Sequence, residues 1–150
     1  MTEKSATRFT VPVTVRFRDL DALGHVNHAV YFTYMEIART EYWMHLMGDH
    51  RVAALNFIVA KASCDFLAPA EIGQRLEVDV RIPALRNSSF DFEYEIRDQA
   101  SGRPIAKGLT VQVHYDYGAR KSVPIPSELR ARITAFEQAG APPSTGATHE

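Results

Sequence analysis

The chain has 150 residues, of which 45% are hydrophobic and 23% are charged. This length suits one globular domain, and such a domain buries roughly 70% of the surface of its unfolded chain. The 17 basic and 18 acidic residues leave a formal net charge of −1. That balance argues against a nucleic-acid or membrane-surface partner, because both attract strongly basic proteins.

Cysteine content and the chain ends bear on the compartment. Cys64 is the single cysteine, so no disulfide can form within the chain and a reducing compartment is expected. The sequence shows no apolar signal-peptide core, no run of ~18 apolar residues and no zinc-type Cys/His spacing. We therefore expect a cytoplasmic domain over residues 8–137, a flexible segment over 1–7 and a disordered tail over 138–150.

Residues 9–18 alternate between apolar and polar side chains, which is typical of a half-buried strand. Pro12 favours an edge or a strand start for this segment, because proline lacks the backbone N–H. Residues 19–29 break the period and are rich in Asp, Gly, His and Asn, so we expect a loop there.

The segment from Val30 to Met47 carries apolar residues at helical spacing on most of its sides. This pattern predicts a long helix that other elements cover. Gly48 is a suitable residue for the helix end. Glu36 and Arg39 lie three residues apart on the polar side of this helix and are expected to pair with each other.

Four further strand-like runs and a short helix complete the domain. The helix is expected from Ser127 to Glu137, with Ser127 as its cap. In the last strand the apolar residues predict the face that points into the core. The strand-like runs are residues 58–66, 76–82, 90–97 and 109–115, and the predicted inner face of the last one is Leu109, Val111, Val113 and Tyr115.

The order of these elements predicts an α+β architecture. Successive strands with short connections pair antiparallel, and one long apolar helix needs a curved sheet that wraps around it. An open sheet edge and the remaining apolar surface favour a homodimer.

The loop before the long helix has the residues that carry chemistry. Asp21 lies just before the helix N-terminus, where unpaired backbone N–H groups can hold an oxyanion. A carboxylate there can attack a carbonyl or deprotonate water, and Gly24 lets the backbone come close to a ligand. The alternative is that Asp and Asn before a helix serve only as caps.

Five segments of the chain form one combined pattern, namely residues 19–31, residues 34–41, Phe66–Ala70, Gly73 and the segment from Arg86 to Phe90. This pattern resembles the 4-hydroxybenzoyl-CoA thioesterase-like branch of the hotdog superfamily. The resemblance covers roughly residues 8–135. It implies the hotdog fold, an antiparallel sheet wrapped around one central helix. It also implies hydrolysis of an acyl-CoA to a carboxylic acid and free CoA, with no metal or other cofactor, at a site between the subunits of a homodimer or homotetramer.

The same resemblance implies roles for single residues. Asp21 matches the catalytic carboxylate, as nucleophile or general base, and the His28 backbone N–H matches the donor that polarises the thioester carbonyl. His25 and Asn27 are expected to support the loop chemistry or its geometry, and Tyr31 matches a position near the acyl pocket or simply in the core. The residues expected to contact substrate are Gly24, Tyr31, Arg86, Ser88 and Ser89, the last three at a turn where relatives hold CoA phosphates.

Three other functions fit the same fold. A non-catalytic acyl-CoA-binding protein would need no carboxylate at Asp21. A hydratase or dehydratase normally needs a different Asp/His pairing, which the sequence does not show. A small acyl-ACP thioesterase remains the nearest alternative, although an acidic carrier protein would favour a basic surface patch and the net charge shows none.

Overall fold

The computed structural model describes residues 9–140. The predicted flexible segment 1–7 and residues 141–150 of the predicted tail lie outside this range. One curved antiparallel sheet has the strand order β1-β3-β4-β5-β2, and a short β6 pairs with β5. The strands are β1 (Phe9–Thr14), β2 (Phe57–Phe66), β3 (Arg75–Leu85), β4 (Ser89–Asp98), β5 (Pro104–Asp116) and β6 (Lys121–Ser122).

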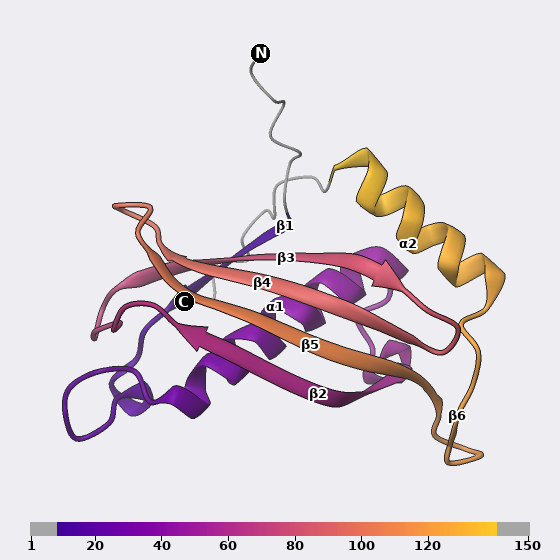
Figure 1. The fold of residues 1–150 in the computed structure, drawn as a ribbon, viewed down its shortest axis with the longest axis horizontal. Helices are drawn as coiled ribbons and strands as arrows, with labels where there is room; N and C mark the ends of the chain where they lie inside the picture. Colours follow the sequence, from indigo (N-terminus) through magenta and orange to yellow (C-terminus); the bar gives the residue numbers. More distant parts are fainter. Residues whose placement is uncertain (1–8, 141–150) are drawn as a thin grey trace.

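The long helix α1 (His28–Met47) lies across one face of this sheet, and α2 (Ser127–Ala139) lies beside β3 (Figure 1). Two short 3-10 turns, Phe17–Asp19 and Val52–Ala54, flank α1. The predicted α+β architecture is confirmed. Among the described residues, no helix has the length and apolar content needed to cross a bilayer.

The boundaries of the first two elements differ from the prediction. β1 ends at Thr14, and Phe17, an apolar residue of the predicted strand 9–18, is 80% exposed within a 3-10 turn. α1 begins at His28, two residues before the predicted start, because Asn27 supplies a side-chain cap. Gly48 ends the helix as predicted, in the left-handed conformation with φ of 63°.

The predicted inner face of β5 is wrong. The buried polar residues Thr110 and Gln112 face α1, whereas Leu109 and Val111 lie half-exposed on the opposite face. Alternation correctly separates two faces of the strand, but it cannot tell which one is inside when polar side chains find partners there.

Those partners form a buried hydrogen-bonded chain beneath α1. The Arg39 guanidinium donates to the Tyr94 hydroxyl at 3.1 Å, and Tyr94 is 2.7 Å from the Thr110 hydroxyl. Thr110 in turn contacts the Gln112 amide at 2.5 Å. The predicted Glu36–Arg39 pair is therefore wrong, since Arg39 is buried and points to the sheet while Glu36 is exposed.

Gly108 allows α1 to approach β5 closely. A Cβ at this position would lie 2.2 Å from the Met35 sulfur and 2.9 Å from its methyl carbon. Both distances are far below van der Waals contact, so a side chain at this position would require the flexible end of Met35 to move.

The helix α2 packs on the core through Leu129, Ile133 and Phe136, but the predicted cap is wrong. Ser127 is the first helical residue, the N-cap position is Pro126, and no side chain of the described residues caps the helix. The helix extends to Ala139, two residues beyond the predicted end. Glu137 accepts hydrogen bonds from the Tyr42 hydroxyl and from the backbone N–H of Ile82, the latter at 2.7 Å.

β2 is a terminal strand of the sheet and is largely exposed. It pairs with β5 on one side only, and a register shift between Val59 and Lys61 interrupts this pairing. The shift places Ile58 opposite Val113 on the outer face, whereas Ala62 lies opposite Thr110 on the inner face. The sequence pattern predicts that Ile58 shares one face with Ala62 and Phe66, and this prediction is wrong for Ile58.

Candidate functional site

The loop between the first 3-10 turn and α1 is a small closed hairpin. Leu20 and Val26 form a β-bridge, and the Asp21 N–H donates to the His25 carbonyl at 2.7 Å. Gly24 has a φ of 80° and donates its N–H to the Asp21 carbonyl at 3.1 Å. The tip of the hairpin therefore needs glycine, because a side chain disfavours that φ.

Backbone contacts hold this hairpin against the rest of the domain. The buried Val26 donates its N–H to the Ala70 carbonyl at 2.9 Å, and His25 forms a bridge with Glu71. The Asn27 N–H donates to the Asp19 carbonyl at 2.9 Å, which closes the loop at its base. The loop is thus fixed at both ends and along one side.

The half-buried Asp21 carboxylate has one oxygen engaged in the loop. Its Oδ1 accepts from the backbone N–H groups of Leu23 at 2.8 Å and His25 at 3.3 Å. Within residues 9–140, Oδ2 accepts no hydrogen bond. The carboxylate is therefore held in position while one oxygen stays available for chemistry.

The start of α1 presents a backbone donor beside this loop. Asn27 caps the helix by accepting from the Ala29 N–H at 2.9 Å, and its carbonyl accepts from the Val30 N–H at 2.9 Å. The His28 N–H has no acceptor among the described residues. A free N–H at the positive end of a helix suits an oxyanion.

Aromatic rings lie next to this donor. The His28 ring stacks on Phe66 with centroids 4.2 Å apart, and Tyr31 meets Phe66 edge-on at 5.3 Å. Tyr31 is buried, which raises the pKa of its hydroxyl, whereas Phe66 is 41% exposed at the end of β2. This arrangement offers an apolar surface where a ligand could lie beside the His28 N–H.

Cys64 lies near the same end of β2. Burial raises the pKa of its thiol to about 11, and the neighbouring Asp65 adds to this shift. The thiolate is therefore scarce near neutral pH, and Cys64 is a poor nucleophile.

Within a single copy of the chain, the site around Asp21 does not include the predicted CoA-phosphate residues Arg86, Ser88 and Ser89. The β3–β4 turn that carries them is at the opposite end of the sheet from the indigo loop (Figure 1). The Arg86 side chain donates to the Ser89 hydroxyl at 2.8 Å and to both oxygens of Asp91 at 3.1 and 2.5 Å. Its role toward CoA remains a prediction, as do the chemical roles of the His25 side chain and Tyr31.

Asp19 is a buried carboxylate in this region whose partners the sequence analysis did not predict. It is 2% exposed and accepts from the Arg16 N–H at 2.9 Å, the Arg16 guanidinium at 3.0 Å and the Tyr34 hydroxyl at 2.8 Å. Burial alone would raise its pKa, but the hydrogen bonds from Arg16 and Tyr34 outweigh burial and lower the pKa. The three-residue spacing of Arg16 and Asp19 was the available signal.

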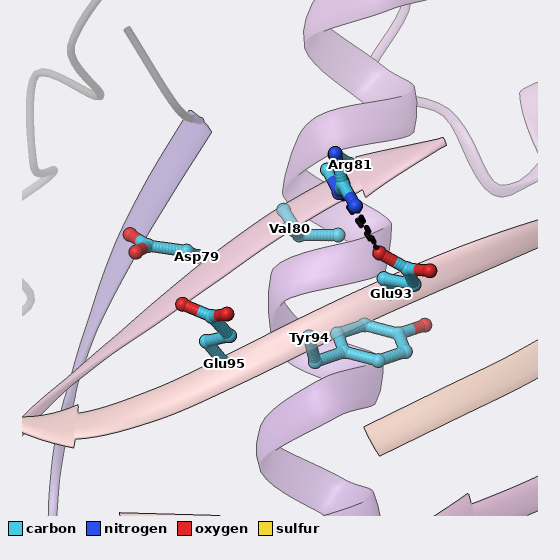
Figure 2. A pocket seen from close by; sticks show the side chains of 6 residues that line it. All are labelled: Asp79, Val80, Arg81, Glu93, Tyr94 and Glu95. Carbon is cyan, nitrogen blue, oxygen red and sulfur yellow. Dashed lines mark hydrogen bonds and ion pairs between the residues drawn. The ribbon is translucent and has the colours of Figure 1, made fainter. Parts of the chain in front are cut away.

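The outer face of the sheet carries a charged pocket that is separate from the loop. Figure 2 shows Asp79, Arg81, Glu93 and Glu95 on the face opposite α1, with Arg81 and Glu93 joined by an ion pair of 2.6 Å. Over the described part of the chain, no group of three or more His, Cys, Asp or Glu side chains is placed to hold a metal ion.

Comparison with known proteins identifies the class of this chain. Residues 15–133 match the thioesterase-like superfamily, and the chain therefore belongs to it. A thioesterase of Thermus thermophilus, solved in complex with coenzyme A and Zn, is 38% identical and superimposes with a TM-score of 0.78 over 89% of this chain and 97% of that one. The fold is thus the hotdog fold, as predicted.

Two sequence relatives narrow the class. The acyl-CoA thioester hydrolase YbgC of Escherichia coli is 37% identical over 99 residues, which cover 61% of this chain and 71% of that protein. A chloroplastic acyl-acyl carrier protein thioesterase of Arabidopsis thaliana is 29% identical over 131 residues, covering 84% and 67%. The prediction of a thioester-hydrolysing enzyme is confirmed at the level of this class.

Proposed function

We propose that the chain hydrolyses acyl-CoA thioesters at the site formed by Asp21 and the N-terminus of α1. The observation that carries the proposal is the Asp21 carboxylate, held through Oδ1 with Oδ2 available, in a loop that leads directly to the free His28 N–H. Membership of the thioesterase-like superfamily and the similarity to an acyl-CoA thioester hydrolase support it.

Two routes use the same residues. In the first, an Asp21 oxygen bonds to the carbonyl carbon, the C–S bond breaks, and CoA leaves as a thiolate that takes up a proton. Water then hydrolyses the acyl–Asp21 anhydride and releases the acid. In the second, Asp21 takes a proton from water as that water bonds to the carbonyl carbon, and the C–S bond then breaks as the proton passes to the CoA sulfur, which releases the acid and free CoA. In both, the His28 N–H stabilises the oxyanion.

The deciding experiment is thiol release from aromatic, short-chain and long-chain acyl-CoAs by the wild type and Asp21→Asn. We expect turnover by the wild type and a loss of at least about 100-fold in kcat for the variant. Asp116→Asn is the matched control, because the Asp116 carboxylate accepts from two backbone N–H groups of its own turn, at 2.9 and 3.0 Å, in a similar way. It should keep wild-type activity.

Other outcomes have clear meanings. Binding of acyl-CoA without turnover would favour a non-catalytic binding protein, and turnover restricted to acyl carrier protein substrates would favour the carrier-protein alternative. Equal rates for the wild type and Asp21→Asn would remove Asp21 from the chemistry. In a single turnover in ¹⁸O-water, label in the Asp21 carboxylate would establish the first route, since only an acyl–Asp21 anhydride that water attacks at the Asp21 carbon places it there.

We also propose that a second copy of the chain completes the site. β2 is an open edge of ten residues, and its exposed inner face adjoins Phe66 beside the loop. Antiparallel pairing of two β2 strands would bring the Phe66 end of one strand next to the Phe57 end of the other. The β3–β4 turn with Arg86 lies at the same end of the sheet as Phe57. A cytoplasmic location stays a prediction from the single cysteine.

A further inference from the structure

Asp19 connects three segments that surround the Asp21 loop. Its carboxylate binds the Arg16 backbone and side chain before the 3-10 turn, and the Tyr34 hydroxyl in the second turn of α1. Its backbone carbonyl accepts from the Asn27 N–H at 2.9 Å, at the other end of the loop. A single residue thus ties the start of the loop, the end of the loop and the helix together.

The hydrogen bonds of Asp19 bear on both groups of the proposed reaction, the Asp21 carboxylate and the His28 N–H. Asp21 is two residues after Asp19, and His28 follows Asn27, so the Asp19–Asn27 bond sets how the carboxylate faces the helix N-terminus. The Tyr34 hydroxyl then anchors Asp19 to the same helix that supplies the His28 N–H. Asp19 is buried, so its charge is not used directly on substrate.

We propose that Asp19 is a positioning residue for the thioesterase reaction, acting with Tyr34 to hold Asp21 in register with the His28 N–H. The inference rests on the proposed function. A displacement of about 1 Å in a catalytic group can cost on the order of 100-fold in rate, so a buried residue outside the contact with substrate can control kcat.

The structure provides a matched pair of tyrosines for the test. Tyr34 and Tyr42 are both buried on α1, and each donates its hydroxyl to a carboxylate, Asp19 and Glu137 respectively. Tyr34→Phe and Tyr42→Phe therefore remove the same group at similar burial, one beside the loop and one far from it. Both should lower the melting temperature by a similar amount.

The kinetic readout should separate them. We expect Tyr34→Phe to lower kcat by about 10-fold with KM changed by less than about 2-fold, and Tyr42→Phe to leave both near wild type. Asp19→Ala should lower kcat further, and Asp19→Asn should recover part of the loss because its amide oxygen still accepts hydrogen bonds. Asp79→Asn, which alters a buried carboxylate on the sheet, should leave kcat unchanged.

Hydrogen exchange of residues 20–28 provides a readout that does not need turnover. We expect faster exchange of the backbone amides of this loop in Tyr34→Phe but not in Tyr42→Phe. Equal loss of kcat in the two tyrosine variants, or wild-type kcat and loop exchange in Tyr34→Phe, would overturn it. If the wild type hydrolyses no thioester, the proposed function fails, and unchanged loop exchange would then count separately against the tie.

Discussion

At the residue scale, the two aspartates of the loop differ in what surrounds them. Asp21 is half-buried and, among residues 9–140, accepts only from backbone N–H groups, with one oxygen available. Asp19 is buried and bound by a guanidinium and a phenol. Two carboxylates two residues apart can therefore serve as reagent and as support, because their partners differ.

The lowered pKa of Asp19 predicts a pH dependence of stability. A carboxylate with a folded-state pKa below its ordinary value of 3.8 stabilises the folded protein fully above that value. This contribution is lost as the pH falls through the folded-state pKa. We expect the free energy of unfolding of the wild type to exceed that of Asp19→Asn by an amount that shrinks as the pH falls. Urea unfolding between about pH 5 and about pH 3 measures this difference. A constant difference would contradict this.

At the element scale, β2 combines an unpaired edge with exposed side chains on both faces. Such an edge is usually covered or charged, and the proposed second copy would cover it. The apolar inner side of the strand would then become buried, whereas its outer side would stay in solvent.

Ala62→Lys and Ser63→Lys test this difference between the faces. Ala62 lies on the inner face opposite Thr110, and Ser63 lies on the outer face opposite Leu109. A lysine at position 62 would place a charge in the proposed interface, so sedimentation should show dissociation toward the monomer. Ser63→Lys should keep the assembly of the wild type. Identical sedimentation of both variants would argue against an interface at the inner side of β2.

The sequence predicted the elements better than the faces they bury. The spacing of apolar residues located α1, and the turns located β3 and β4, because these signals are local. The inner face of β5 was inverted, since Thr110 and Gln112 find partners on other elements. The loop motif predicted Asp21 as a candidate, whereas the proposed role of Asp19 depends on Tyr34, which is 15 residues away in sequence and meets it only in the fold.

At the scale of the whole molecule, the β3–β4 turn, which carries Arg86, and the loop before α1, which carries Asp21, lie at opposite ends of the domain (Figure 1). An antiparallel pair of copies would bring one of each together. Arg86 of one copy would then contact the phosphates of a CoA substrate bound at Asp21 of the other copy. Asp21 of the first copy would act on a second substrate molecule. The two sites of a dimer would be equivalent by symmetry.

Arg86→Gln and Asp91→Asn test this arrangement as a pair. Both remove the Arg86–Asp91 ion pair, but only the first removes the cation that a phosphate would bind. We expect Arg86→Gln to raise KM for acyl-CoA by about 5-fold with kcat unchanged. Asp91→Asn should leave KM unchanged or lower it. A similar rise in KM for both would reduce Arg86 to a structural role.

The close approach of α1 to β5 at Gly108 also constrains how this protein can change over evolutionary time. A side chain at position 108 would meet the flexible end of Met35, so a larger residue there requires Met35 to move or to be replaced by a shorter residue. Relatives that carry alanine or serine at the position of Gly108 should carry a shorter residue at the position of Met35. The pair should therefore covary across the family, leaving a record of helix–sheet packing in sequences alone.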